Sequence, residues 1–401
     1  MRRTILVILA LSLTLSFFNS CDKKPLDLNK LADKIEVGLK GKPYGYAFVI
    51  SKWDQASVSR AGGSARLSQD PPEMKMTVDV KYTMASVSKI PTTAALFKLL
   101  DDTDLKNKGL TFDQKLDEKI VDYLPYNWKP GAGVDTITFR ELLRHRAGLR
   151  CPPDTDDYQS LKKCLAAGID VNDKQKDCDN VKPAPAIGVG CYRNVNFGLL
   201  RVLMAVIKGS IKKPASSTFT EAQTDAENAL VSSNVYMKYV NENVFAPSGL
   251  PQIFCMPSDG NQQGLTYKHA APNAKGGDFG DFSMFCGAHG WFLSAAQLGK
   301  FFQTLNTTNK IISPALATKM RTELLSYDWS SEFNSPDGKI TSWWKAGGHP
   351  AASNLGEINT LVVHFSNGVE VVMVINSDFS PTNFDWGGLI QKSHEDLLNG
   401  L

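Results

Sequence analysis

The sequence predicts an α/β (α+β) fold: an antiparallel sheet built from both ends of the chain, flanked by helices, with an inserted and mainly helical lobe. Residues 44–50 form an apolar run typical of a strand, and residues 361–375 read as a β-hairpin around Asn367-Gly368. Helical patterns dominate the stretch between them. The economical architecture therefore joins N-terminal and C-terminal strands in one sheet.

The elements follow in chain order. Leu31, Ile35 and Leu39 recur every four residues, which predicts an amphipathic helix over residues 28–39. After the first strand, Gly62-Gly63 indicates a turn and Pro71-Pro72 a break. Further helices are expected over residues 86–101, 137–146, 194–208, 220–245, 295–305, 314–325 and 389–398.

These patterns predict how the chain is divided. Residues 1–20 are expected to be a lipoprotein signal peptide, and residues 21–103 and 286–401 to form the sheet domain. Residues 104–285 are expected to form the helical domain, which contains a cysteine-rich loop over residues 151–191. That loop is long for a compact domain, so disulfide bridges are a reasonable way to hold it.

Composition excludes several classes of protein. The chain has 401 residues, of which 42% are hydrophobic and 21% charged, as in an ordinary folded protein rather than a disordered or collagen-like one. Its 44 basic and 41 acidic residues leave a net charge of +3, too balanced for an electrostatic nucleic-acid interface. We therefore expect no nucleic-acid partner.

The N-terminus has the features of an export signal. Arg2 and Arg3 precede an apolar stretch over residues 5–18, which is too short for a relaxed membrane span but suits a secretory signal. Ser20 followed by Cys21 resembles a bacterial lipoprotein cleavage site. We expect a protein that is exported and lipid-anchored at Cys21 to the bacterial envelope, in the periplasm or at the cell surface. Plain secretion with an incidental Cys21 is the alternative.

Six further cysteines suit an oxidising compartment. An even number allows complete pairing, with 15 possible connectivities for six cysteines. Metal binding is the rival interpretation, but the CxxC and HExxH spacings are absent, so we expect no metal and no cofactor. Pairing of nearest neighbours gives three candidate disulfides, Cys151–Cys164, Cys178–Cys191 and Cys255–Cys286.

The sharpest chemical signal is Ser86-x-x-Lys89 at the start of a predicted helix. Residues three apart share one helix face, so the two side chains are neighbours. A buried lysine is shifted toward its neutral amine, which can accept the proton of a serine hydroxyl. The spacing alone is a weak signal because it arises by chance in many proteins.

Two further motifs follow in order: Tyr192-x-Asn194 and Lys345-Ala346-Gly347. With Ser-x-x-Lys, they resemble the serine β-lactamase and penicillin-binding protein superfamily, in particular its class C, DD-peptidase and esterase branch. The resemblance extends over residues 44–398 and implies a β-lactamase/transpeptidase-like fold. Its other landmarks are the stretches 120–125, 137–149, 243–250 and 290–298.

The resemblance implies a role for each matching residue. Ser86 would be the acylated nucleophile, and Lys89 would help to deprotonate it. Tyr192, as phenolate or hydrogen-bond relay, would be the other general base and would later activate the deacylating water. Asn194 would hold Lys89 and a substrate amide. Lys345 would lower the pKa of Tyr192 and attract a substrate carboxylate.

The third motif would also supply the oxyanion hole and part of the cleft. The resemblance implies that the backbone N–H groups of Ser86 and Gly348 bind the oxyanion. The expected substrate-binding residues are Trp344, Ala346, Gly347 and His349. Ordinary alternatives stay open: packing for the tryptophan and the histidine, a core position for Tyr192, a helix cap for Asn194 and a solvated edge for Lys345.

The chain departs from the family pattern at several positions. Ala346 lacks the hydroxyl that lactamases use to bind the β-lactam carboxylate, and Arg193 is bulkier than the usual residue between Tyr and Asn. Pro91 should bend the nucleophile helix or remove one of its hydrogen bonds. The cysteine-rich insertion borders the site. These departures leave the catalytic groups in place but put the substrate in doubt.

The resulting hypothesis is a β-lactamase-related serine hydrolase that acts through an acyl-enzyme at Ser86. Its substrate would be a small molecule, short peptide or ester: a β-lactam, a D-Ala peptide or an ester. The alternatives are a penicillin-binding sensor or non-turnover binding lipoprotein, and a structural lipoprotein on an inactive scaffold. An α/β-hydrolase is disfavoured because the chain lacks a G-x-S-x-G elbow. The pattern leaves the oligomeric state open.

Overall fold

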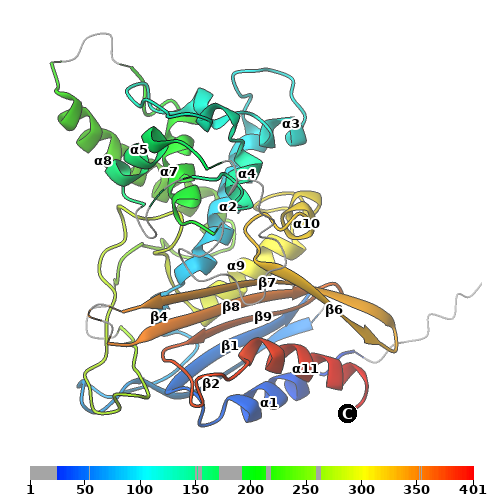
Figure 1. The fold of residues 1–401 in the computed structure, drawn as a ribbon. Coiled ribbons are helices and arrows are strands. Elements are labelled where there is room, and N and C mark those ends of the chain that lie inside the picture. The colour runs from blue at the N-terminus through cyan, green and yellow to red at the C-terminus, as the bar shows by residue number, and fades with distance from the viewer. Residues whose placement is uncertain are drawn as a thin grey trace, which may run out of the picture.

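The sheet is built from both ends of the chain, as predicted. The computed structural model describes residues 25–401 except 54, 150, 152–155, 171–191, 214–217, 259–262, 352 and 354. Among these residues, seven strands form one antiparallel sheet in the order β3-β2-β1-β9-β8-β7-β6 (Figure 1). Strand β1 lies between β2 and β9, with Tyr46 opposite Ile375. The strands are β1 (Gly45–Lys52), β2 (Gln55–Arg66), β3 (Met74–Lys75), β6 (Trp329–Ser335), β7 (Gly338–Pro350), β8 (Glu357–Phe365) and β9 (Val369–Ile375).

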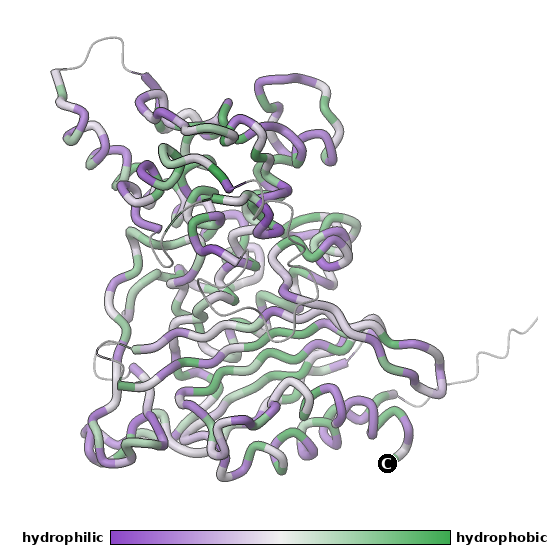
Figure 2. The backbone as a smooth tube through the Cα atoms, viewed as in Figure 1, coloured by the Kyte–Doolittle hydropathy of each residue, from purple (hydrophilic) through white to green (hydrophobic). Residues whose placement is uncertain are grey.

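Helices cover both faces of this sheet. Helices α1 (Leu28–Leu39) and α11 (Trp386–Leu398) pack together below it in Figure 1, while α2 (Lys89–Asp102) and α9 (Ala295–Thr307) lie on the other face. Because both faces are covered, the central strands β1, β8 and β9 are buried almost throughout and read as continuous apolar runs. Figure 2 shows these strands as the most hydrophobic part of the backbone.

A helical lobe stands above the sheet. Its helices are α3 (Phe112–Leu116), α4 (Phe139–Leu143), α5 (Tyr158–Ala167), α7 (Val195–Ile207) and α8 (Glu221–Val240), the last continued by a π-helical turn (Asn241–Phe245). Helix α10 (Pro314–Thr322) packs beside α9 and α2. Segment 264–267 leaves the lobe and contacts the sheet, where the Tyr267 N–H donates to Asn376 O.

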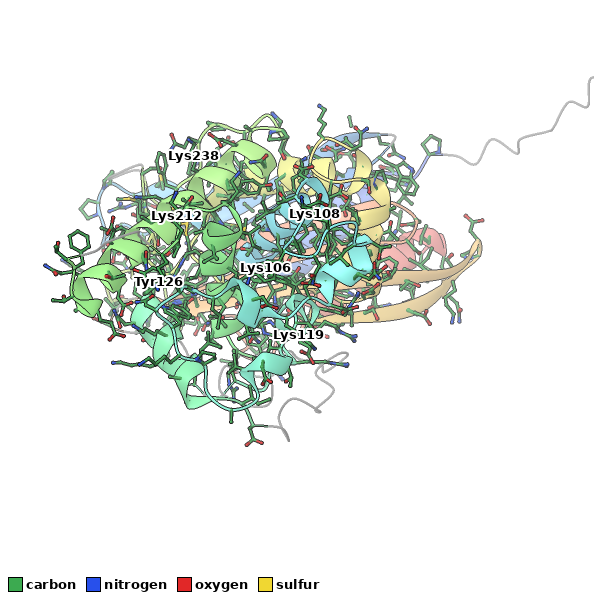
Figure 3. All side chains as sticks on the ribbon, turned by 90° about the horizontal axis from the view of Figure 1, so that it is seen from above. Lys106, Lys108, Lys119, Tyr126, Lys212 and Lys238 are labelled. Atoms are coloured by element: carbon green, nitrogen blue, oxygen red, sulfur yellow. A yellow bond between two sulfur atoms is a disulfide. The ribbon has the colours of Figure 1, made fainter. Side chains whose placement is uncertain are left out.

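The outer surface of the lobe carries several exposed lysines. Figure 3 looks down on this surface and labels them together with Tyr126. Two of the lysines have acidic neighbours, because Lys106 pairs with Asp122 and Lys238 with Glu242. The labelled lysines, all exposed, are Lys106, Lys108, Lys119, Lys212 and Lys238.

One local prediction was wrong. The Gly62-Gly63 pair does not turn but continues β2, and Gly63 has φ +78°. A Cβ at Gly63 would lie 2.0 Å from Tyr44 O, so this glycine marks a close approach of two strands. Helix α2 begins at Lys89 and continues through Pro91, which lies in its first turn, where a proline is tolerated; the predicted bend or lost hydrogen bond stays a prediction.

Two of the three predicted disulfides are confirmed. Cys151 bonds to Cys164, and Cys255 to Cys286. The proposed third pair, Cys178 and Cys191, and the lipidation candidate Cys21 lie outside the described residues. Among the described helices, none has the length and apolarity to cross a membrane.

Reduction of the disulfides is expected to lower the melting temperature, because each cross-link of this size stabilises a fold by roughly 2–4 kcal/mol. The measurement is thermal unfolding with and without reductant, followed by the Cys151→Ser/Cys164→Ser and Cys255→Ser/Cys286→Ser double variants. Unfolding at the same temperature in both redox states would contradict the bonds.

Candidate active site

A short two-stranded ribbon fixes the segment that carries Ser86. Strands β4 (Lys81–Thr83) and β5 (Phe292–Ser294) pair antiparallel, so the residues after β4 lie against those before β5. The Met84 N–H donates to Trp291 O, and the Thr360 hydroxyl donates to Met84 O. Ala85 then adopts φ +43°, a backbone strain of the kind that clusters at functional sites. Ser86 follows in a 3₁₀ turn (Ala85–Ser88) that leads into α2.

Lys89 is fully buried at the start of α2 and points at Ser86. Its Nζ lies 3.1 Å from Ser86 Oγ, 2.9 Å from Asn194 Oδ1 and 2.8 Å from Ala288 O. Because two of these acceptors are carbonyl oxygens, each holds an N–H of the amine. The remaining position on Nζ is thereby directed at the serine oxygen.

Tyr192 approaches Ser86 from the helical lobe. Its hydroxyl donates to Ser86 Oγ over 2.7 Å. Burial raises the pKa of Tyr192 above its ordinary value, and the nearby Lys345 ammonium opposes this rise only in part. The ring packs against His145, with 4.2 Å between the ring centroids. His145 itself accepts from the Arg193 N–H at Nδ1, so it holds the residue after Tyr192 in position.

Asn194 occupies the N-cap position of α7 without capping it. Its side chain makes no hydrogen bond to the first turn of the helix and accepts from Lys89 Nζ. Its side chain is therefore committed to the buried cluster around Ser86.

Lys345 is paired with a carboxylate that the sequence analysis did not single out. Its Nζ lies 2.5 Å from Asp328 Oδ1, and the side chain of Lys345 is 0% exposed and that of Asp328 5%. The second carboxylate oxygen accepts from the Ala346 N–H over 2.9 Å. Burial lowers the pKa of Lys345, but Asp328 and Tyr192 together outweigh this effect, so the pKa lies above its ordinary value. The ammonium also lies 5.0 Å from the centre of the Tyr192 ring.

The backbone of β7 next to Ser86 presents N–H groups at an edge that is not paired with β8. In an antiparallel strand, alternate residues direct both backbone groups to the same edge. The Ala346 N–H points away from β8 toward Asp328, so the Gly348 N–H, two residues on, points to this same free edge. Gly347 abuts the serine directly: a Cβ there would lie 2.9 Å from Ser86 N.

A cavity of about 1330 Å³ opens at this edge. It is lined by Ser86 and Tyr192 on one side of β7 and by residues of α11 and the loop before it on the other. Trp344, although nearly buried, stacks on Trp329 in the cavity wall, 5.9 Å between ring centroids. His349 instead packs among Phe279, Phe282 and His289. Two more of the predicted substrate-binding residues, Ala346 and Gly347, also line the cavity, as does Gly348, which was predicted for the oxyanion hole.

Sequence reasoning missed Asp328 and the carbonyl of Ala288. A signal for Asp328 existed in the Asp337-Gly338 pair, which marks a hairpin between β6 and β7. In its register Trp329 lies opposite Trp344, so Asp328 comes next to Lys345. The Ala288 carbonyl had no comparable signal, because any residue offers this group.

The arrangement can perform nucleophilic catalysis. One half-buried serine oxygen has an amine and a phenol within hydrogen-bond reach, both able to move a proton, beside backbone donors and an open cavity. Among the described residues, no group of three or more His, Cys, Asp or Glu side chains could hold a metal ion.

Comparisons with known proteins agree with the fold. The chain resembles FmtA from Staphylococcus aureus, with a TM-score of 0.62 and 16% identity in an alignment that covers 94% of this chain and 89% of the other. It also resembles D-amino acid amidase from Ochrobactrum anthropi SV3, with a TM-score of 0.59 and 16% identity over 92% of this chain and 97% of the other. A class C beta lactamase from Rhodobacter sphaeroides is similar as well, with a TM-score of 0.58 and 16% identity over 93% of this chain and 99% of the other. Among curated proteins none matches the sequence. The profile of the Beta-lactamase family matches residues 31–387, most of the chain, and the protein therefore belongs to the beta-lactamase family.

Proposed function

We propose that this protein is a serine hydrolase that cleaves an amide or ester bond through an acyl-enzyme on Ser86. The observation that carries the proposal is the position of the Ser86 oxygen, 3.1 Å from Lys89 Nζ and 2.7 Å from the Tyr192 hydroxyl, at the wall of an open cavity. Family membership and the fold shared with amidase and lactamase structures support a hydrolase.

In acylation, Ser86 Oγ attacks the substrate carbonyl carbon while its proton passes to Lys89 or Tyr192. The carbonyl oxygen becomes negatively charged between the N–H groups of Ser86 and Gly348. When the intermediate collapses, the bond to the leaving group breaks, and the leaving amine or alcohol takes the proton that the serine gave up. The serine is then esterified, and the leaving group departs into the cavity.

In deacylation a water molecule takes the place of the leaving group. The water oxygen bonds to the acyl carbon as Tyr192 takes a proton from the water. The ester bond to Ser86 Oγ then breaks, Oγ receives a proton from Tyr192 directly or through Lys89, and the acid product leaves. The raised pKa of Tyr192 favours this relay, because a hydroxyl that stays protonated at rest can donate on one side while accepting on the other.

The test is mass spectrometry of the protein after exposure to a fluorophosphonate and, separately, to penicillin, with Ser86→Ala as the control. An adduct on Ser86 that the alanine variant lacks supports the nucleophile, and turnover of an ester supports the enzyme. A permanent penicillin adduct without turnover would favour the sensor. A folded chain that takes neither adduct would be an inert scaffold.

We propose in addition that the protein is exported and anchored to the envelope by a lipid on Cys21. The leader over residues 1–20 and the two disulfides support this location, because disulfides persist in oxidising compartments. The mass of the mature N-terminus and labelling with a radioactive fatty acid test it, with Cys21→Ser expected to abolish the label. An unlabelled wild-type chain that retains residues 1–20 would contradict the proposal.

A further inference from the structure

The Lys345-Ala346-Gly347 motif suggests a positive charge facing the substrate, but the cavity is lined by the carboxylate that pairs with this lysine. Asp328 lines the same cavity as Ser86, whereas Lys345 has a wholly buried side chain and is not among the lining residues. The Asp328 carboxylate is also fixed, since one oxygen holds Lys345 Nζ at 2.5 Å and the other holds the Ala346 N–H at 2.9 Å. A substrate in the cavity therefore borders the anionic member of this ion pair and not the lysine ammonium.

The rest of the cavity reinforces this charge. Its lining contains three further carboxylates and one lysine, and Lys392 is itself paired with Asp396 at 3.0 Å. The same lining contains four aromatic rings, which form its apolar wall. The three carboxylates are Asp385, Glu395 and Asp396, and the rings are Trp329, Trp344, Phe384 and Trp386.

We infer that Asp328 is a specificity-determining residue that directs the site toward esters and amides without a carboxylate beside the scissile bond. This inference rests on the proposed function and narrows its substrate class. A carboxylate next to the reacting carbonyl would approach an anion that cannot move aside, and like charges at that range repel. A neutral leaving group would meet no such charge and would be free to contact the aromatic wall.

The test compares a matched pair of substrates, phenyl acetate and 3-carboxyphenyl acetate, which differ in one carboxylate on the leaving group. The wild-type protein is expected to favour the neutral ester in kcat/KM. Asp328→Asn removes the charge and keeps an acceptor for the Ala346 N–H. It is expected to raise kcat/KM for the charged ester relative to the neutral one by at least about tenfold.

Glu332→Gln is the matched control, since it removes an exposed carboxylate from β6, the strand that follows Asp328, and Glu332 does not line the cavity. It is expected to leave the preference between the two esters as in the wild type. If Asp328 had only a structural role, Asp328→Asn would lower kcat/KM for both esters by the same factor. Asp328→Ser, which admits water to Lys345, serves as a second variant if asparagine impairs folding.

Binding provides a readout that does not need turnover. Phenylboronic acid and 3-carboxyphenylboronic acid bond reversibly to active-site serines, and their affinities can be followed by tryptophan fluorescence. The neutral acid should bind the wild type more tightly, and Asp328→Asn should narrow the difference. Equal binding, tighter binding of the charged acid or binding of neither would overturn the inference. If the wild-type protein binds the neutral boronic acid more tightly but hydrolyses no ester, the result would count against the proposed function alone.

Discussion

Lys89→Ala is expected to slow acylation of Ser86 by at least about 10³-fold, because nucleophile and base act as a unit. The substitution removes the amine that lies 3.1 Å from the serine oxygen and that Asn194 and the Ala288 carbonyl hold in place. The measurement is the rate of Ser86 labelling by a fluorophosphonate, followed by mass spectrometry.

Lys98→Ala is the matched control for this experiment. Lys98 lies on the same helix, but it is partly exposed and pairs with Asp102. It should label at the wild-type rate. A near-normal rate for folded Lys89→Ala would show that Lys89 does not act as the base.

Gly347→Ala is expected to lower ester turnover by about 10²-fold, the cost of misplacing a reacting group by roughly 1 Å. A Cβ at this position would lie 2.9 Å from both Ser86 N and Met84 O. Both are backbone atoms, so the nucleophile segment itself must shift. The measurement is kcat/KM for a neutral ester together with the unfolding temperature.

Gly280→Ala controls for the general effect of replacing glycine. A Cβ at Gly280 would meet no atom within 4 Å. This variant should retain both activity and stability. Unaltered turnover in Gly347→Ala would mean that the serine segment can move without loss, which would contradict a tightly positioned nucleophile.

The sequence predicted those parts of the site that local spacing encodes. Ser86 and Lys89 share one helix face at three-residue spacing, and motif resemblance supplied Tyr192, Asn194 and Lys345. The structure brings all five side chains into one cluster. Their catalytic roles stay predictions until the variants are measured.

Groups defined only by tertiary packing were harder to predict. Asp328 reaches Lys345 through a hairpin whose first strand is too polar and too exposed to stand out as a strand. For the fold, buried strands were predicted well because their apolar runs are continuous. Strand β2 was missed because its burial is irregular and Gly62-Gly63 resembles a turn.

The position of β1 also constrains when the molecule can fold. This strand pairs on one side with β2, its neighbour in the chain, and on the other with β9 from near the C-terminus. Contacts so distant along the chain form slowly, because a long loop must close before they are made. Half of the strand partners of β1 lie near the end of the chain, so a chain shorter than about 375 residues would leave one edge of β1 open to association with other strands.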